Sequence, residues 1–341
     1  MPEADAYRET GDRRRSDDRD AVRYGLVAAS SPKKAAGLVA ALGPRMQLSC
    51  VYEPVAYLGP MLGEATGAAV VRSLSRLAER RGIKAAVVAN GGAYGVDLLR
   101  PLLRHNLPVL WLDRPAALAA DWPAIHEVDE LATVVPALLD RYTGATLRLR
   151  ELLVGPLGPV ESITIRPRNE RGTEHAARLE QLDWCRWLTY PRLERLDDHR
   201  VRLTAAGGRS AEAVFLATAN EPSNESASES ASESPRETPD VPDDADATAA
   251  GDRDPTIGPA HSPATFSALV ECRGGVAEVS GNTLRWRAAG QSQWQDVDLS
   301  SERSALGVVA DLFARRVIGG LVPTPLLDDL VSLEALFPRG D

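Results

Sequence analysis

The chain has 341 residues, of which 44% are hydrophobic, and its formal net charge is −9. At roughly 100–200 residues per domain, this length predicts about two domains with sizeable cores. The acidic balance argues against nucleic acid as a partner, because phosphates repel an acidic surface. Residues 1–22 are charged, with no apolar signal core, and no run of about 18 apolar residues follows. We therefore expect a cytoplasmic protein with no membrane partner.

Cys50, Cys185 and Cys272 are widely separated and form no C-x-x-C pair. Clustered zinc ligands usually come in such closely spaced pairs, so we expect no metal site. Isolated cysteines in odd number are typical of buried, reduced thiols in a cytoplasmic protein.

The first half of the chain alternates short apolar runs with amphipathic stretches, after a charged tail at 1–22 that we expect to be disordered. Strands are predicted at 23–29, 46–52, 68–71, 83–89 and 108–112. Helices are predicted at 33–42, 55–65 and 94–105, with another starting at Ser73. This alternation predicts an α/β domain of the Rossmann type over 23–120, with helices on both faces of a parallel sheet.

Ligands of such sheets bind where the strands end, at their carboxyl edges. Four separate segments follow predicted strands: residues 28–31, Glu53, residues 90–92 and residues 113–115. We expect these segments to converge on one crevice.

The second half, residues 121–337, predicts an α+β domain with a mostly antiparallel open sheet, because its strands cluster apart from its helices. Strands are predicted at 160–166, 201–203, 211–217, 265–272, 276–279, 283–288 and 294–299. Helices are predicted at 144–154, 174–188 and 302–318, the last of them closing this domain.

Residues 219–263 interrupt that sheet with a stretch that is rich in Ser, Glu, Asp and Pro and has no aromatic residue. Such a composition is typical of disorder, and the entropy of closing a loop rises only logarithmically with its length. We interpret the stretch as a disordered insertion between two strands. A solvated loop is favoured over a phosphorylated or partner-binding segment.

Several short motifs occur in a recognisable order. They comprise Glu53-Pro54 after the second strand, the triplet 113–115, and residues 141–145, 149–153, 155–160, 183–188, 310–313 and 323–325. Together they resemble the Gfo/Idh/MocA family, which includes glucose–fructose oxidoreductase and inositol dehydrogenase. The resemblance covers residues 23–337 apart from the insertion.

The resemblance implies an activity as well as a fold. Its implied cofactor is NAD or NADP, bound in the first domain. The implied substrate is a small sugar, cyclitol or related polyol over the open sheet of the second domain, and the reaction is hydride transfer. It also implies a homo-oligomer whose subunits pair through that sheet.

The turn after the first strand departs from the expected G-x-G-x-x-G, in which missing Cβ atoms let the backbone approach a pyrophosphate. Residues 28–33 contain no glycine, and Ala28 stands first in the run. Ser30 and Ser31 could donate hydroxyl groups to a phosphate, and Ser31 could cap the following helix. The alternative is a helix cap that binds no nucleotide.

Glu53 lies near the position of the acid that binds the adenosine ribose, and its charge would favour NAD over NADP. A surface carboxylate at a strand end is the alternative. Asn90 and Gly91 follow the fourth strand and would allow close approach to a nicotinamide.

Arg114 and Pro115 stand where the family has Lys-Pro, so the resemblance places them at the cofactor and Arg114 at the reacting centre. Arginine can hold an anion, but it stays charged and is a poor acid–base group. Asp183 matches the family's helix Asp, and Glu180 replaces a histidine one turn earlier. Either carboxylate could transfer a proton, although an exposed helix carboxylate is the simpler interpretation of Glu180.

Two hypotheses follow from these residues. The first is an NAD(P)-dependent oxidoreductase that orients its substrate with Arg114 and moves a proton through Asp183 or Glu180. The second is a catalytically inactive homologue that keeps the fold as a metabolite-binding, structural or regulatory protein.

Overall fold

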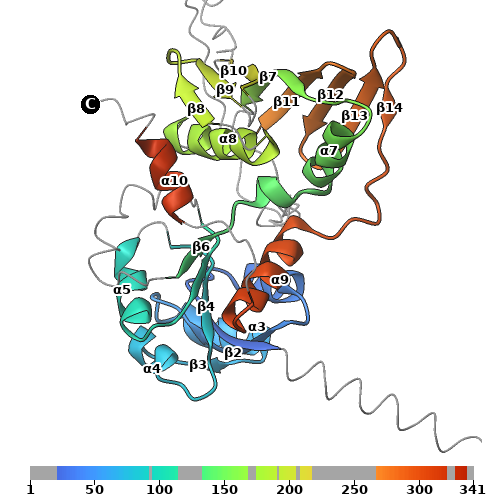
Figure 1. Cartoon of the computed structure of the whole chain (residues 1–341). Helices are drawn as coiled ribbons and strands as arrows, with labels where there is room; N and C mark the ends of the chain where they lie inside the picture. The colour runs from blue at the N-terminus through green and yellow to red at the C-terminus, as the bar shows by residue number, and fades with distance from the viewer. Residues whose placement is uncertain are drawn as a thin grey trace, which may run out of the picture.

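The computed structural model describes residues 21–91, 94–113, 133–167, 174–189, 192–204, 208–216, 266–320 and 327–335. These residues form two β-sheets, each with its own helices, which we call the sheet A lobe and the sheet B lobe (Figure 1). The predicted tail lies outside the described residues except for Ala21 and Val22, and Val22 already begins the first strand. The predicted insertion at 219–263 also lies outside them.

Sheet A is parallel throughout, with strand order β3-β2-β1-β4-β5-β6. Its strands are β1 (Val22–Val27), β2 (Met46–Tyr52), β3 (Ala69–Val70), β4 (Ala85–Val88), β5 (Val109–Trp111) and β6 (Val134–Pro136). The predicted parallel sheet is therefore confirmed. The division of the chain near residue 120 stays a prediction, and β6, which the sequence did not reveal, lies beyond it.

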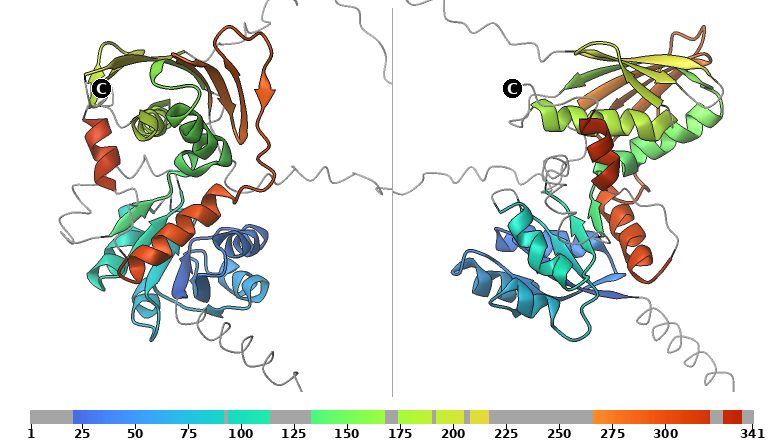
Figure 2. Two further views of the ribbon diagram at one scale, coloured as in Figure 1. Left: turned by 45° about the vertical axis from the view of Figure 1, so that its right-hand side comes forward. Right: turned by 60° about the vertical axis from the view of Figure 1, so that its left-hand side comes forward.

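Among the residues that the structure describes, five helices cover the two faces of sheet A (Figures 1 and 2). They are α2 (Pro32–Leu42), α3 (Leu58–Thr66), α4 (Leu74–Ala78), α5 (Val96–Arg104) and α9 (Ala305–Val317). Buried side chains of α4 and α5 pack with one face of the strands, and those of α2, α3 and α9 pack with the other. The prediction that the helix at 302–318 closes the second domain is wrong, since α9 packs against α2.

Sheet B has the order β14-β13-β12-β11-β7-β10-β9-β8. Its strands are β7 (Val160–Pro167), β8 (Arg192–Arg195), β9 (Arg200–Thr204), β10 (Ser210–Phe215), β11 (Phe266–Cys272), β12 (Gly275–Ser280), β13 (Thr283–Ala288) and β14 (Gln295–Asp296). Among the described strands, β7 and β10 are the one pair that runs in parallel, so the predicted mostly antiparallel sheet is confirmed.

One face of sheet B is covered by α7 (Gly144–Val154) and α8 (Glu174–Thr189), with α10 (Leu327–Glu334) packed against α8. A short 3-10 helix, η2 (Leu139–Tyr142), leads from β6 into α7. Side chains on this inner face are buried, whereas their neighbours along each strand are more exposed. This alternation is what a sheet packed on one side requires.

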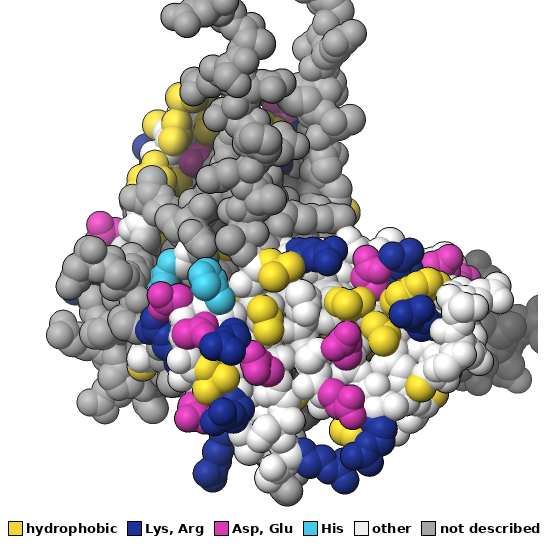
Figure 3. All heavy atoms as spheres, turned by 90° about the horizontal axis from the view of Figure 1, so that it is seen from above, with side chains coloured by type: hydrophobic (Ala, Val, Ile, Leu, Met, Phe, Trp, Pro, Cys, Tyr) yellow, Lys and Arg dark blue, Asp and Glu magenta, His cyan; other side chains and the backbone are white. Residues whose placement is uncertain are grey.

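The outer face of sheet B carries a mixture of charged, polar and hydrophobic side chains (Figure 3). Seen from the end of the molecule that carries this sheet in Figure 1, acidic, basic and hydrophobic side chains are interspersed (Figure 3). Opposite charges pair across neighbouring strands, as in Arg285 with Glu278 and Arg202 with Glu194. Self-association through this face stays a prediction.

The three cysteines are buried and unpaired, as predicted. Burial raises the pKa of every one of these thiols, that of Cys272 to about 12, so they are poor nucleophiles. In the part of the chain that the structure describes, no helix combines the length and apolar character needed to cross a bilayer. Those same residues include no cluster of three or more His, Cys, Asp or Glu that could hold a metal ion.

Candidate functional site

The turn between β1 and α2 takes a left-handed backbone at two residues that are not glycine. Ala28 has φ 53° and Ser30 has φ 61°. This conformation costs an L-residue about 1–2 kcal/mol, and glycine adopts it without that cost. The turn therefore keeps a backbone suited to glycine even though the glycines themselves are absent.

Side chains from two other strand ends hold this turn in place. The Ser30 amide donates to Glu53 Oε2 at 3.1 Å, and the Val55 amide donates to Glu53 Oε1 at 3.4 Å. Asn90 Nδ2 donates to Ser30 Oγ at 2.5 Å. The ends of β1, β2 and β4 thus meet at Ser30, as the sequence predicted for these three segments.

The start of α2 offers the features of an anion site. Ser31 is its N-cap in an extended conformation, and Pro32 occupies the first turn without the amide that an N-terminus leaves unpaired anyway. The Ser31 hydroxyl accepts no capping hydrogen bond. A helix N-terminus carries partial positive charge, and Lys33 and Lys34 add to it.

These residues fit a dinucleotide. The anion site at α2 lies directly after the left-handed turn, where a pyrophosphate would bind. Glu53 is buried to 8% exposure, and each of its oxygens accepts one backbone hydrogen bond. A carboxylate can accept about four, so capacity remains for ribose hydroxyl groups.

Gly91 is required by packing against Trp111. A Cβ atom at Gly91 would lie 2.0 Å from a ring carbon of Trp111, on the neighbouring strand β5. The Trp111 indole also donates to the carbonyl of Asp113. Arg114 and Pro115, which follow Asp113, lie outside the described residues.

Replacing Ala28 with glycine is expected to raise the free energy of unfolding by about 1 kcal/mol, since glycine removes the cost of the left-handed conformation. Urea denaturation would measure the change. Gly67, also left-handed at φ 67°, provides the matched control, because Gly67→Ala should lose a similar amount. A loss of stability in Ala28→Gly would contradict the assigned backbone.

Asp183 lies on α8, in the sheet B lobe, and forms a buried ion pair. Arg141 Nε donates to its Oδ2 at 2.7 Å, and Arg141 Nη2 donates to its Oδ1. Asp183 is 1% exposed and Arg141 is 8% exposed. The two-pronged contact engages both carboxylate oxygens and stabilises the charged form. Accepting a proton here would break the pair.

Glu180 lies one turn before Asp183 on α8 and is partly buried. The structure thus brings Ser30, Glu53 and Asn90 together in one lobe and places both predicted proton-transfer carboxylates on a helix of the other.

Arg141 stands in one of the segments that carry the family resemblance, but its role was not predicted from the sequence. Hydrogen bonds that link α7 to α8 were not predicted either: Trp184 Nε1 donates to Thr146 Oγ1 at 3.0 Å, and Thr146 Oγ1 lies 2.8 Å from Thr143 Oγ1. Asp183 itself could have predicted a buried partner such as Arg141, because a carboxylate on an apolar helix face needs a cation or several hydrogen-bond donors.

Comparison with known proteins gives matches only among solved structures. A scan against known protein families finds no match, and neither does a search of curated proteins. A myo-inositol dehydrogenase from Corynebacterium glutamicum matches with a TM-score of 0.58 and 15% identity, over 93% of this chain and 94% of that one. The chain has the fold of the Gfo/Idh/MocA oxidoreductases. The resemblance inferred from sequence is confirmed at the level of the fold.

Two further structures show the same fold. One is a variant of a 3-ketoreductase from Actinomadura kijaniata in complex with NADP, with a TM-score of 0.60 and 12% identity, over 93% of this chain and 95% of that one. The other is the transcriptional regulator Gal80p from Kluyveromyces lactis, with a TM-score of 0.61 and 13% identity, over 93% and 90% of the two chains. The fold therefore occurs in a reductase and in a regulator.

Proposed function

We propose that the chain is a dinucleotide-binding homologue of the Gfo/Idh/MocA oxidoreductases that has lost hydride-transfer catalysis and acts as a metabolite-binding or regulatory protein. The observation that carries this proposal is the buried ion pair of Asp183 with Arg141. Asp183 is the more buried of the two carboxylates predicted to transfer a proton, and the ion pair gives it a structural role instead.

The proposed dinucleotide is NAD, held across the ends of β1, β2 and β4. Glu53 binds the adenosine ribose and repels the 2′-phosphate of NADP. Ser30, Ser31 and the start of α2 hold the pyrophosphate, and Ala28 supplies the turn that admits it. Asn90 and Gly91 lie beside the nicotinamide, with Arg114 and Pro115 completing the site. The ligand-bound 3-ketoreductase supports nicotinamide binding by this fold.

Loss of catalysis rests on the chemistry of the replacements. Arg114 stays protonated at any relevant pH and cannot relay a proton as lysine does. Glu180 remains as the one predicted proton-transfer carboxylate outside the ion pair, where it replaces the histidine that the family resemblance implies. The match to Gal80p supports a regulatory use of this fold.

The second candidate is an active NAD(P)-dependent oxidoreductase that acts on a sugar, cyclitol or related polyol. The matches to an inositol dehydrogenase and to a 3-ketoreductase favour it. In that case Arg114 orients the substrate and Glu180 accepts the proton.

Titration with NAD, NADH and NADPH tests the binding part of the proposal. NADH is expected to raise the melting temperature and change its own fluorescence, because a ligand at ten times its Kd stabilises the folded state by about 1.4 kcal/mol. NADPH should have less effect. In Glu53→Gln the preference for NADH should shrink, whereas Glu79→Gln, an exposed carboxylate on the surface, serves as the control. No response to any dinucleotide would remove the proposed site.

Assay of the same protein separates the two candidates. With NAD and a panel of polyols and sugars, the proposal expects no NADH to form. Turnover by the wild-type chain would establish the second candidate instead. Arg114→Lys, tested on the same panel, asks whether the missing acid–base group alone prevents the reaction.

A further inference from the structure

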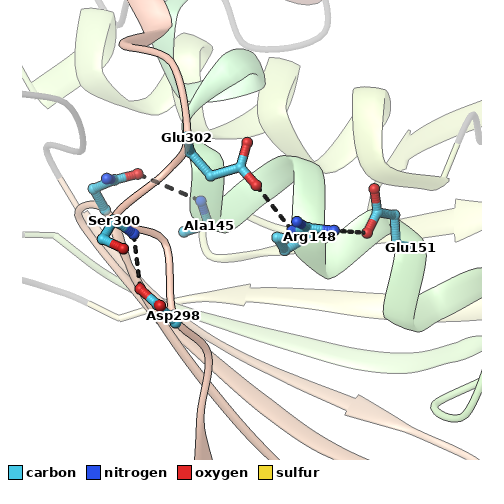
Figure 4. A network of polar contacts seen from close by, with 7 residues as sticks. Ala145, Arg148, Glu151, Asp298, Ser300 and Glu302 are labelled. Atoms are coloured by element: carbon cyan, nitrogen blue, oxygen red, sulfur yellow. Dashed lines mark hydrogen bonds and ion pairs between the residues drawn. The ribbon is translucent and has the colours of Figure 1, made fainter.

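Two segments that pass between the lobes meet at the first turn of α7. The first runs from β6 through η2 into α7, and the second runs from β14 through residues 297–304 into α9. Figure 4 shows this meeting point, where the second segment passes across the start of α7. The two segments are far apart in sequence, so contacts between them hold parts of the fold that the chain does not join directly.

The first segment is fixed to the sheet B lobe by the buried pair. Arg141 belongs to η2, directly after the last strand of sheet A, and Asp183 belongs to α8, on the inner face of sheet B. Tyr142 also contacts Trp187, one turn beyond Asp183, with ring centroids 5.7 Å apart. One turn of α8 is thus held by the residues that leave sheet A.

The second segment is fixed to the first by close contacts at α7. Arg148 Nε lies 2.9 Å from Glu302 Oε1 (Figure 4). A Cβ atom at Gly144 would lie 2.9 Å from the Cβ of Glu302, so only glycine allows this approach. The Ala145 amide donates to Asn282 Oδ1 at 3.4 Å, which adds a link to sheet B.

Packing contacts connect both lobes to the region around the first turn of α7. Beyond Glu302 the chain enters α9, which packs against η2 and α2 of the sheet A lobe. A single cluster of buried side chains includes Val134 of β6, Ala145 of α7 and Ile163 of β7. Apolar contact of this kind is non-directional and permits sliding, whereas a two-pronged guanidinium–carboxylate pair fixes both distance and orientation.

We propose that Arg141 and Asp183 are positioning residues of an interlobe joint, and that their ion pair sets the angle between sheet A and sheet B. The joint acts in the ligand-free chain, so this role does not rest on dinucleotide binding. A purely local role for the pair would affect stability and leave the angle unchanged.

Spin labels at Met61→Cys on α3 and Thr283→Cys on β13 report the distance between the lobes. Met61 and Thr283 are exposed, and the three native cysteines are buried and escape labelling. Pulsed electron paramagnetic resonance on the ligand-free full chain is expected to give one narrow distribution of the distance between the two spin labels. The Asp183→Asn variant should broaden or shift this distance distribution, because it loses the two-pronged contact between the Asp183 carboxylate and Arg141.

Arg141→Lys is the second variant, since it keeps the charge and loses only the two-pronged geometry. Arg141→Lys should also broaden the distance distribution. If Asp183→Asn does not fold, the result for Arg141→Lys alone tests whether the ion pair sets the angle between the lobes. The exposed pair on sheet B supplies the control, so Arg202→Gln should leave the distribution unchanged. Folded Asp183→Asn or Arg141→Lys protein with the wild-type distribution would overturn the proposal, as would equal broadening in Arg202→Gln.

Discussion

Replacing Asp183 with asparagine is expected to lower the free energy of unfolding by about 3–5 kcal/mol. Asparagine has nearly the same shape as aspartate, so the change removes charge and leaves the packing intact. Arg141 would then remain buried, at 8% exposure, without the Asp183 carboxylate that accepts from its Nε and Nη2. The cost arises from keeping the guanidinium buried after the Asp183 charge is removed, and not from the lost attraction alone.

Urea denaturation of four proteins measures the effect: wild type, Asp183→Asn, Arg141→Met and the double variant. The double variant is expected to lose less than the sum of the single losses, because it leaves no charge behind. The exposed pair provides the comparison, and Glu194→Gln should cost about 1 kcal/mol or less. A loss in Asp183→Asn as small as the one at Glu194 would show that water reaches Arg141.

This expectation also bears on function, since the same pair separates the two candidate activities. A general base must exchange a proton during turnover, and an Asp183 that stabilises the fold as a carboxylate cannot do so without weakening the joint. If this chain is active, it would therefore have to move the proton through a residue other than Asp183, such as Glu180. The stability of Asp183→Asn and the polyol assay thus test one idea in two independent ways.

Local sequence signals predicted most of the elements well. The strand at 46–52 and the helices at 33–42 and 144–154 match β2, α2 and α7 closely. Each helix has its own boundary residues, such as Pro32 at the start of α2 and Thr143, whose side chain caps α7. Such signals act within one turn of the chain, so a single sequence is enough to recognise them.

Contacts between distant residues could not be predicted in the same way. The amphipathic pattern of α9 predicts a buried face and says nothing about which sheet buries it. Arg141 and Asp183 are 42 positions apart. The sequence contains many other arginines that could have been the partner. Only the packing of η2 against α8 selects this pair, and that packing depends on both lobes.

The β1–α2 turn shows a different limit. Residues 28–33 lack the expected glycines, and the sequence left a nucleotide site and a helix cap without a nucleotide as alternatives, yet Ala28 and Ser30 adopt the left-handed conformation. The Ser30 amide donates to Glu53 and the Asn90 amide donates to the Ser30 hydroxyl, and both hydrogen bonds help to hold Ser30 there. Glycine is therefore the least costly way to build this turn and not the only one, and neighbouring strand ends supply what the residue type does not.

Gly91→Ala is expected to be the other strongly destabilising change, with a loss of about 2–3 kcal/mol from overpacking. An added Cβ atom would lie 2.0, 2.4 and 2.9 Å from three carbons of the Trp111 ring. Trp111 is almost fully buried, so its ring has no open space to enter. It must tilt, and its hydrogen bond to Asp113 must change with it.

Two companion variants show whether the Trp111 ring is the cause. The clashing carbons belong to the outer ring of the indole, which a phenylalanine at position 111 would not reach. Adding Trp111→Phe to Gly91→Ala is therefore expected to cost less than the two single changes together. Gly37→Ala, in α2, has no atom within 4 Å of the new Cβ and should stabilise the chain by about 0.5–1 kcal/mol.

The displacement also reaches the proposed dinucleotide site, because Asp113 directly precedes Arg114 and Gly91 directly follows Asn90. NADH binding measured well below the melting temperature should therefore weaken in Gly91→Ala and recover in the double variant. If the double variant recovers its stability but not its NADH binding, then Gly91 contacts the ligand as well as packing against Trp111. If Gly91→Ala leaves both stability and binding unchanged, the close packing of β4 against Trp111 is wrong, and the geometry assigned to this end of the site fails with it.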